Sequence, residues 1–280
     1  MTWRRPLVTV VIPTFNWATV LPWSIGSVRA QTFTDWELWV VGDGCTDESA
    51  AVVESIDDRR VRWHNLAHNE GSQVGPNNAA LGLARGEYIA YLGHDDLWLP
   101  QHLHMLVGLM RSGAGFAHGR QLRLDPGVAP YVSPPMVYVF ARNDWLAPTS
   151  VMHRRDDARS VGGWRFPDET SINDPESDLW SRLAERVGPP TMSGEVTSVK
   201  LPAALRADVY RERPCDEQAA WWGRITTASD ATNFLATALA DGAPGAAERY
   251  PISAPASLQD GSTTARERHR LRRSFKGLDD

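Results

Sequence analysis

LVTVVIPTFN, at residues 7–16, is the stretch that decides the fold. Its first six residues are an unbroken, mostly β-branched run that ends at Pro13, which is typical of a strand buried on both faces of a parallel sheet. An apolar periodicity of helical type follows over residues 20–28, and ELWVV at 37–41 repeats the buried-strand pattern. This order of strand, helix and strand indicates a right-handed βαβ unit.

The same alternation continues to about residue 112. We expect a helix over 50–56, a strand at 61–63, a helix from Pro76 to about Ala84, a strand over 87–92 and a helix opened by Pro100. Beyond residue 112 the pattern loosens, with a strand-like stretch at 136–140 and a helix over 177–186. The sequence predicts an α/β fold, with a mixed, mostly parallel central sheet flanked by helices and a C-terminal helical or irregular extension.

Size and composition narrow the class of protein. With 280 residues, 42% of them apolar, the chain can bury a sizeable core without disulfides. A net charge of -5 argues against a nucleic-acid binder, which needs a concentrated basic surface. Cys45 and Cys215 are too far apart for a CxxC metal motif. The apolar run after Arg5 is too short for a signal peptide, and no stretch approaches the roughly 18 to 20 apolar residues of a membrane span. We therefore expect a cytoplasmic protein without a transmembrane segment.

The last part of the chain changes in composition. Residues 241–264 are rich in Ala, Gly, Pro and Ser and read as a linker or a loosely held strap. The segment ARERHRLRRSFK, at 265–276, is strongly basic. Charge runs of this kind usually form a solvated helix, which we favour; the alternative is a peripheral contact with anionic lipid.

Polar residues follow three of the predicted strands: Thr14-Phe15-Asn16, Gly42-Asp43-Gly44 and Gly93-His94-Asp95-Asp96. Ligands of parallel sheets bind at these carboxyl ends. Carboxylates there repel a bare phosphate, but they suit a Mg²⁺ or Mn²⁺ ion shared with a diphosphate. The alternative is that Asp95 or Asp96 merely caps the next helix. Asp47 stands at the third glycine position of a dinucleotide fingerprint, and no P-loop, HExxH or GxSxG motif is present.

Five segments, taken in order, resemble the family 2 glycosyltransferases with the GT-A, Rossmann-like fold: VTVVIPTFN (8–16), QTFTDWELWVVGDGCTD (31–47), NEGSQVGPNNAALGLARGEYIAYLGHDD (69–96), TSVMHR (149–154) and ESDLWSRL (176–183). The resemblance implies inverting transfer of a sugar from a nucleotide-diphosphate donor, most commonly of uridine, to an acceptor hydroxyl. The acceptor class stays open between a carbohydrate, a lipid-linked and a small-molecule acceptor. The resemblance also implies a nucleotide-sugar-binding half at residues 1–112, an acceptor-binding half at 113–200 and a C-terminal extension with a basic tail at 201–280.

The resemblance assigns roles to individual donor-site residues. Asp43 would contact the base, and the turn Pro13-Thr14-Phe15-Asn16 would lie against the same nucleoside. Asp96 would hold Mn²⁺ or Mg²⁺ on the diphosphate, and Asp95 would hold the ribose or donor sugar, or assist the metal. His153 would contact the diphosphate or the metal. The family usually has acidic residues where Gly42 and His94 stand here.

An inverting displacement also needs a general base that takes the proton of the acceptor hydroxyl. Matching the family pattern on Asp178-Leu179-Trp180 places Glu176 at the base position, with Pro175 in place of the usual Glu. Asp174 and Asp178 are the other candidates. The alternative is that these acidic residues only stabilise a helix N-terminus through its dipole.

Two other functions stay open at this point. A sugar-1-phosphate nucleotidyltransferase would have a glycine-rich loop near its N-terminus. The corresponding stretch here, PTFNWATVLP at 13–22, contains no glycine. A non-catalytic nucleotide-sugar-binding protein is suggested by Gly42, His94 and Pro175, which stand where the family has acidic residues. Turnover of a donor would separate an enzyme from a binder.

Overall fold

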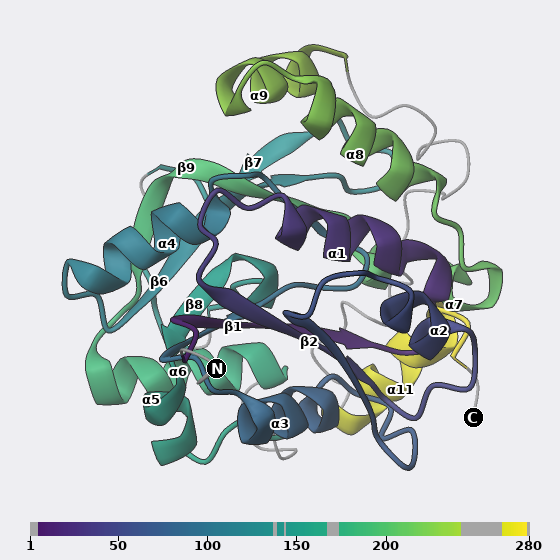
Figure 1. Cartoon of the computed structure of the whole chain (residues 1–280), viewed down its shortest axis with the longest axis horizontal. Coiled ribbons are helices and arrows are strands. Elements are labelled where there is room, and N and C mark those ends of the chain that lie inside the picture. Colours follow the sequence, from purple (N-terminus) through teal and green to yellow (C-terminus); the bar gives the residue numbers. More distant parts are fainter. Residues whose placement is uncertain (1–4, 137–138, 143, 167–173, 242–264, 279–280) are drawn as a thin grey trace.

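The computed structural model describes residues 5–136, 139–142, 144–166, 174–241 and 265–278 (Figure 1). Within these residues, nine strands form one sheet: β1 (Val8–Thr14), β2 (Trp36–Gly42), β3 (Val61–Asn65), β4 (Tyr88–Tyr91), β5 (Leu97–Trp98), β6 (Phe116–Arg123), β7 (Tyr131–Ser133), β8 (Val151–Arg154) and β9 (Thr191–Lys200). Their order is β3-β2-β1-β4-β8-β6-β9-β5, and β7 pairs with β6.

Parallel and antiparallel pairing divide the sheet. β1 pairs in parallel with β2 and β4, and β2 pairs in parallel with β3. β8 is antiparallel to both β4 and β6, whereas β9 runs parallel to β6 and antiparallel to β5. The predicted α/β fold with a mixed sheet is confirmed, and the predicted strands and helices before residue 112 are all found.

Helices cover both faces of the sheet (Figure 1). One face packs against α1 (Leu21–Arg29), α2 (Ser49–Glu54) and α4 (His102–Arg111), and the other against α3 (Val74–Leu83), α5 (Arg155–Ser160) and α6 (Pro175–Val187). Val10 and Ile12 of β1 belong to the first core, and Val11 belongs to the second. Because side chains alternate along a strand, a strand covered on both faces is apolar almost throughout; in LVTVVI the one polar residue, Thr9, is hydrogen-bonded to Glu37.

Some predicted boundaries are corrected by the structure. α3 begins at Val74, so Pro76 is its third residue; the first turn of a helix lacks intrahelical N–H partners, and a proline costs little there. α4 begins at His102, two residues after Pro100. Of the strand-like stretch 136–140, residues 137 and 138 lie outside the described residues, and the described ones form no strand.

The predicted C-terminal extension is helical where it is described. It contains α7 (Val209–Glu212), α8 (Asp216–Thr227), α9 (Ala231–Asp241) and α11 (Ala265–Phe275). α8 packs along α1, and α11 lies beside α7 on the far side of the molecule from α9 (Figure 1). None of the helices in the described ranges is long and apolar enough to cross a membrane.

Candidate functional site

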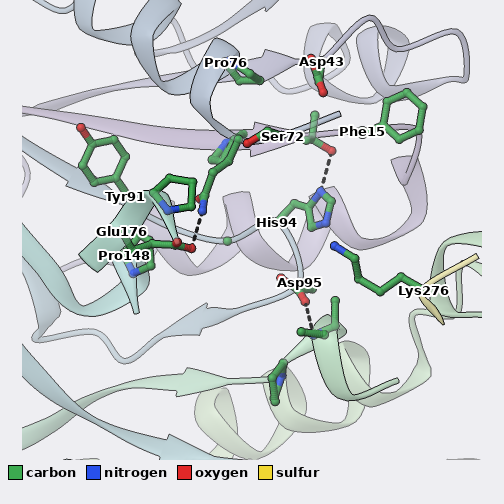
Figure 2. A pocket seen from close by; sticks show the side chains of 18 of the residues that line it. Phe15, Asp43, Ser72, Pro76, Tyr91, His94, Asp95, Pro148, Glu176 and Lys276 are labelled. Carbon is green, nitrogen blue, oxygen red and sulfur yellow. Dashed lines mark hydrogen bonds between the residues drawn. The ribbon is translucent and has the colours of Figure 1, made fainter. Parts of the chain in front are cut away.

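A cavity of about 330 Å³ opens at the carboxyl ends of β1, β2 and β4, where the sequence predicts the chemistry (Figure 2). We call it the strand-end pocket. Its lining includes six of the predicted site residues: Pro13, Thr14, Asp43, Asp95, Asp174 and Glu176. The other predicted site residues lie outside the lining: Asn16, Asp96, His153 and Asp178.

Asp43 directly follows β2 and lies in one wall of the pocket. Its N–H donates to the carbonyl of Thr14 at 2.8 Å, which ties the ends of β1 and β2 together. Its carboxylate accepts hydrogen bonds from the backbone N–H groups of Glu70 (2.8 Å) and Gly71 (3.0 Å). Burial raises the pKa of the Asp43 carboxyl, and these two N–H groups oppose that rise. The result is a fixed, largely desolvated acceptor.

Asn16 supports this wall from outside the pocket. It adopts a left-handed backbone conformation with φ of 45°, which asparagine tolerates. Its side-chain oxygen accepts hydrogen bonds from the N–H groups of Thr46 (2.7 Å) and Asp47 (3.3 Å). Asn16 therefore holds the turn after β2 in place, while Pro13 and Thr14 face the pocket.

Gly42 stands where the family usually has an aspartate, and the structure explains the glycine. A Cβ at Gly42 would lie 2.3 Å from Oδ1 of Asn65 and 2.7 Å from the ring of Trp63. The Asn65 amide exchanges two hydrogen bonds with the backbone of Cys45, at 2.8 and 2.9 Å. Asn65 thus fills the space beside the end of β2 that an acidic side chain at position 42 would need.

His94 and Asp95 follow β4 and line the pocket. Both ring nitrogens of His94 are hydrogen-bonded, Nδ1 to the hydroxyl of Thr14 (2.9 Å) and Nε2 to the hydroxyl of Tyr210 (3.0 Å). Burial lowers the pKa of His94 to about 3, so the ring is neutral and acts as a spacer. Asp95 Oδ2 accepts a 3.3 Å hydrogen bond from the N–H of Ala203, and its carboxylate faces the pocket (Figure 2).

Asp96, the predicted metal ligand, is fully buried beneath the pocket. Its Oδ2 accepts hydrogen bonds from the Lys200 ammonium, at 2.8 Å, and from the Thr149 hydroxyl. Its Oδ1 accepts from the N–H of Leu201 at 2.9 Å. The lysine and these donors occupy both oxygens of Asp96. The Asp96 side chain therefore holds the Asp95 loop in place and does not reach the pocket.

His153, the second predicted metal ligand, is likewise not brought to the pocket. It is fully buried in β8, where Nε2 lies 3.1 Å from the hydroxyl of Tyr91 and Nδ1 lies 2.9 Å from the carbonyl of Arg154. Burial lowers its pKa to about 4. The side chain is a neutral core histidine, which packs against the rings of Tyr91 and Trp180 on one face of the sheet.

The pocket can still accommodate a divalent ion held mainly by a ligand. Among the described residues, no three His, Cys, Asp or Glu side chains form a ready metal cluster. A Mg²⁺ or Mn²⁺ ion on a diphosphate needs only one or two protein carboxylates, since phosphate oxygens and water complete its shell. Asp95 fits that role as the carboxylate at the end of β4 that faces the pocket.

Glu176 lies on a different wall, in the first turn of α6. Its Oε1 accepts a hydrogen bond from the side-chain amide of Gln73 (Figure 2). Burial, and then the nearby charge of Asp174, raise the pKa of Glu176 to about 7. Asp174 is the N-cap of α6 and accepts a 2.8 Å hydrogen bond from the N–H of Ser177. Asp174 therefore has the helix-capping role, and it also raises the basicity of Glu176.

Asp178 faces away from the pocket. It is buried and accepts hydrogen bonds from the guanidinium groups of Arg165 and Arg182, each through two nitrogens. The structure thus uses Asp178 to tie α6 to Arg165, because two residues along the helix from Glu176 turn the side chain by about 200°, onto the opposite face.

Sequence reasoning missed several residues of the lining. Three cations, Lys200, Arg273 and Lys276, face the pocket together with the ring of Tyr210. The basic run at 265–276 was the only signal for two of them. Trp145 and Phe166 also line the pocket, and each is 44% exposed. They form an apolar part of its rim.

Comparison with known proteins bears on the family. The sequence model of glycosyl transferase family 2 matches residues 9–157, just over half of the chain. A UDP-Glc:alpha-D-GlcNAc-diphosphoundecaprenol beta-1,3-glucosyltransferase of Escherichia coli is 32% identical over 114 residues, which are 40% of this chain and 45% of the relative. A GalNAc(5)-diNAcBac-PP-undecaprenol beta-1,3-glucosyltransferase of Campylobacter jejuni is 33% identical over 118 residues, 40% of this chain and 37% of the relative. The chain thus spans less than half the length of these curated relatives.

Solved structures with the same fold are more distant in sequence. S. aureus TarS 1-349 in complex with UDP superposes with a TM-score of 0.55 at 18% identity, covering 84% of this chain and 70% of that one. The mannosyltransferase PcManGT from Pyrobaculum calidifontis, in complex with GDP-Man and Mn²⁺, gives a TM-score of 0.55 at 16% identity, covering 99% and 84%. These neighbours confirm the predicted GT-A fold. With the family model matching more than half of its length, the chain belongs to glycosyl transferase family 2.

Proposed function

We propose that this protein is an inverting glycosyltransferase that moves a sugar from a nucleotide-diphosphate donor, UDP-linked in the first instance, to an acceptor hydroxyl. One observation carries the proposal. A single pocket joins two strand-end carboxylates, Asp43 and Asp95, to Glu176 on a separate wall, whose pKa is raised to about 7. The first two suit a nucleotide, and the third suits a base that works near neutral pH.

Asp43 and the Pro13-Thr14 turn are the proposed nucleoside contacts. The carboxylate of Asp43 is held by two backbone N–H groups and keeps lone pairs for N–H or O–H donors of the nucleoside. Asp95 is the proposed protein ligand of Mn²⁺ or Mg²⁺. When bound, such an ion would neutralise charge on the diphosphate as it leaves.

Glu176 is the proposed general base. Its carboxylate would take the proton of the acceptor hydroxyl while that oxygen attacks the anomeric carbon from the face opposite the diphosphate. Gln73 keeps the carboxylate in place through the hydrogen bond to Oε1. The carbon–oxygen bond to the diphosphate breaks as the new glycosidic bond forms, so the anomeric configuration inverts.

A lipid-linked saccharide is the acceptor class that we propose. The Escherichia coli and Campylobacter jejuni relatives are named for acceptors on diphosphoundecaprenol. The exposed rings of Trp145 and Phe166 at the rim offer apolar surface beside the pocket, suited to stacking on a sugar or to a lipid surface. We accordingly place the protein in the cytoplasm, working at the membrane surface.

Binding is the first test. Calorimetry with UDP, GDP and dTDP, each with Mn²⁺ and with chelator, should find one nucleotide that binds tightly to the wild type. Asp43→Asn should lose that binding, and Asp95→Asn should lose its dependence on Mn²⁺. Asp57→Asn, an exposed aspartate outside the pocket, is the control. Absence of binding by all three nucleotides would refute a donor site here.

Turnover is the second test, and it separates an enzyme from a binder. The wild type should hydrolyse or transfer from the matching sugar nucleotide, and the product should have inverted anomeric configuration by NMR. Glu176→Gln should bind the donor normally and turn it over much more slowly. Donor binding without any turnover by the wild type, across the acceptors tried, would favour a non-catalytic nucleotide-sugar-binding protein.

A further inference from the structure

The basic C-terminal segment enters the strand-end pocket. Arg273, Lys276 and Leu278 all line it, together with carboxylates from the first half of the chain. The sequence predicts a solvated helix for residues 265–276. The helix is present as α11, but its end is not simply solvated.

Backbone hydrogen bonds fix this end of α11. The N–H of Asp208 donates to the carbonyl of Phe275 at 2.9 Å, and the N–H of Tyr210 donates to the carbonyl of Lys276 at 2.8 Å. The Lys276 ammonium also lies 5.3 Å from the centre of the Tyr210 ring. Since Tyr210 bonds to His94, this chain of contacts connects α11 directly to the loop after β4.

The two cations reach different parts of the pocket. Lys276 points towards His94 and Asp95 (Figure 2), and its charge contributes to the lowered pKa of His94. Arg273 lies against Gly71, where a Cβ would come within 2.5 Å of Nη1. The N–H of Gly71 is one of the two donors that hold Asp43. The cations therefore lie along the wall that runs from Asp43 to Asp95.

The charges that line the pocket indicate which ligand this wall suits. The pocket lining carries four carboxyl groups, Asp43, Asp95, Asp174 and Glu176, which by themselves would repel a phosphate. A nucleoside diphosphate brings further negative charge, and a single metal ion cannot balance all of it. Lys and Arg side chains form strong, charge-assisted hydrogen bonds to phosphate oxygens.

We propose that Lys276, with Arg273 beside it, binds the diphosphate of the nucleotide sugar, so that α11 forms one wall of the donor site. This inference rests on the proposed function and adds a contact from the C-terminal extension to it. Lys200 also lines the pocket, but its charge is paired with Asp96, so Lys276 and Arg273 are the cations that this inference uses.

The test compares UDP with uridine, which lacks the phosphates. Calorimetry and displacement at fixed Mn²⁺ and fixed salt should show that Lys276→Gln weakens UDP binding about 10- to 100-fold, the effect of losing one charge-assisted hydrogen bond. Uridine binding should stay within about twofold. Lys276→Arg should restore most of the UDP affinity, and Arg273→Gln should give a second, independent loss.

Arg270→Gln is the matched control, because Arg270 is an exposed cation of the same helix outside the pocket lining. Unchanged UDP affinity in Lys276→Gln, or an equal loss for UDP and uridine, would overturn the inference while leaving the proposed function intact. A wild type that binds no nucleoside diphosphate would instead refute the proposed function itself. If the wild type selects GDP or dTDP, the same comparison uses that nucleotide and its nucleoside.

Discussion

Glu176→Gln separates two consequences of a carboxyl group with a raised pKa, namely its effect on catalytic activity and its effect on the stability of the fold. The substitution keeps the side-chain volume and the oxygen that accepts from Gln73, but it removes the ionisation. The pKa of Glu176 is raised to about 7, first by burial and then by the charge of Asp174. About a tenth of the wild-type side chain is then ionised at pH 6 and about nine tenths at pH 8.

The activity should follow this ionisation. Because only the carboxylate can accept the acceptor's proton, kcat/KM of the wild type should rise about tenfold from pH 6 to pH 8. Glu176→Gln should lose roughly 10²- to 10⁴-fold in kcat, the usual contribution of a positioned base, and should lose this rise as well. The assay is initial-rate transfer from the preferred donor at a series of pH values.

The contribution of Glu176 to stability should fall as the pH rises, whereas the activity increases. The folded-state pKa of Glu176 lies above its ordinary value of 4.5, so stability is fully present below about pH 4.5 and is lost as the pH rises through about 7. Glutamine has no such loss. The free energy of unfolding of Glu176→Gln should therefore exceed that of the wild type at pH 8 by up to about 3 kcal/mol and match it near pH 4.5. Urea denaturation at both pH values measures this difference.

Glu185→Gln is the control for both measurements, since Glu185 is an exposed carboxylate on the same helix. It should change neither the pH profile of the rate nor the pH dependence of stability. A Glu176→Gln variant with near-normal turnover would refute the role of Glu176 as base. A stability difference that does not change with pH would refute the raised pKa.

Three further substitutions test the structural reading of the site. His153→Gln should change the effect of Mn²⁺ on nucleotide affinity by no more than about twofold in calorimetry. It should cost about 1–3 kcal/mol of stability, because a buried hydrogen bond to Tyr91 is lost. Loss of the metal dependence would instead show that His153 is a metal ligand. Lys200→Met should cost about 3–5 kcal/mol in urea denaturation at pH 7, since it leaves the Asp96 carboxylate buried without its ion-pair partner; a neutral result would mean that Asp96 is not charged. Gly42→Asp, which restores the family's residue, should lower stability by about 1–3 kcal/mol through the clash with Asn65 and should bring no gain in nucleotide affinity; tighter binding would show that the turn adapts.

The sequence was most informative about the parallel half of the sheet. Strands such as β1 are covered on both faces and read as nearly continuous apolar runs, so they stand out without any alignment. β6 reads FAHGRQLR, and its polar residues hide a strand that is nonetheless mostly buried. His118 and Gln121 are buried there. Their burial depends on the pairing of β6 with β8 and β9, which lie far along the chain.

The same distinction applies to the site. The strand-end carboxylates could be predicted because the carboxyl ends of neighbouring parallel strands meet at one edge of the sheet. Which of Asp95 and Asp96 faces the pocket could not be predicted, because it depends on Lys200, a residue more than 100 positions away. The entry of Lys276 into the pocket likewise depends on backbone contacts with Asp208 and Tyr210 that no local pattern announces.

The pairing of β5 with β9 also bears on the order of folding. β5 follows the Asp95–Asp96 loop at once, yet Leu97 pairs with Val199 of β9, about a third of the chain away. Contacts so distant in sequence form late, because a long loop must close before they are made. The β3-β2-β1-β4 layer is drawn entirely from the chain up to Tyr91, so it can pair without β9. A folding intermediate with that layer in place would still have a mobile Asp95 loop, so the ability to hold a ligand should be among the last properties that the chain acquires.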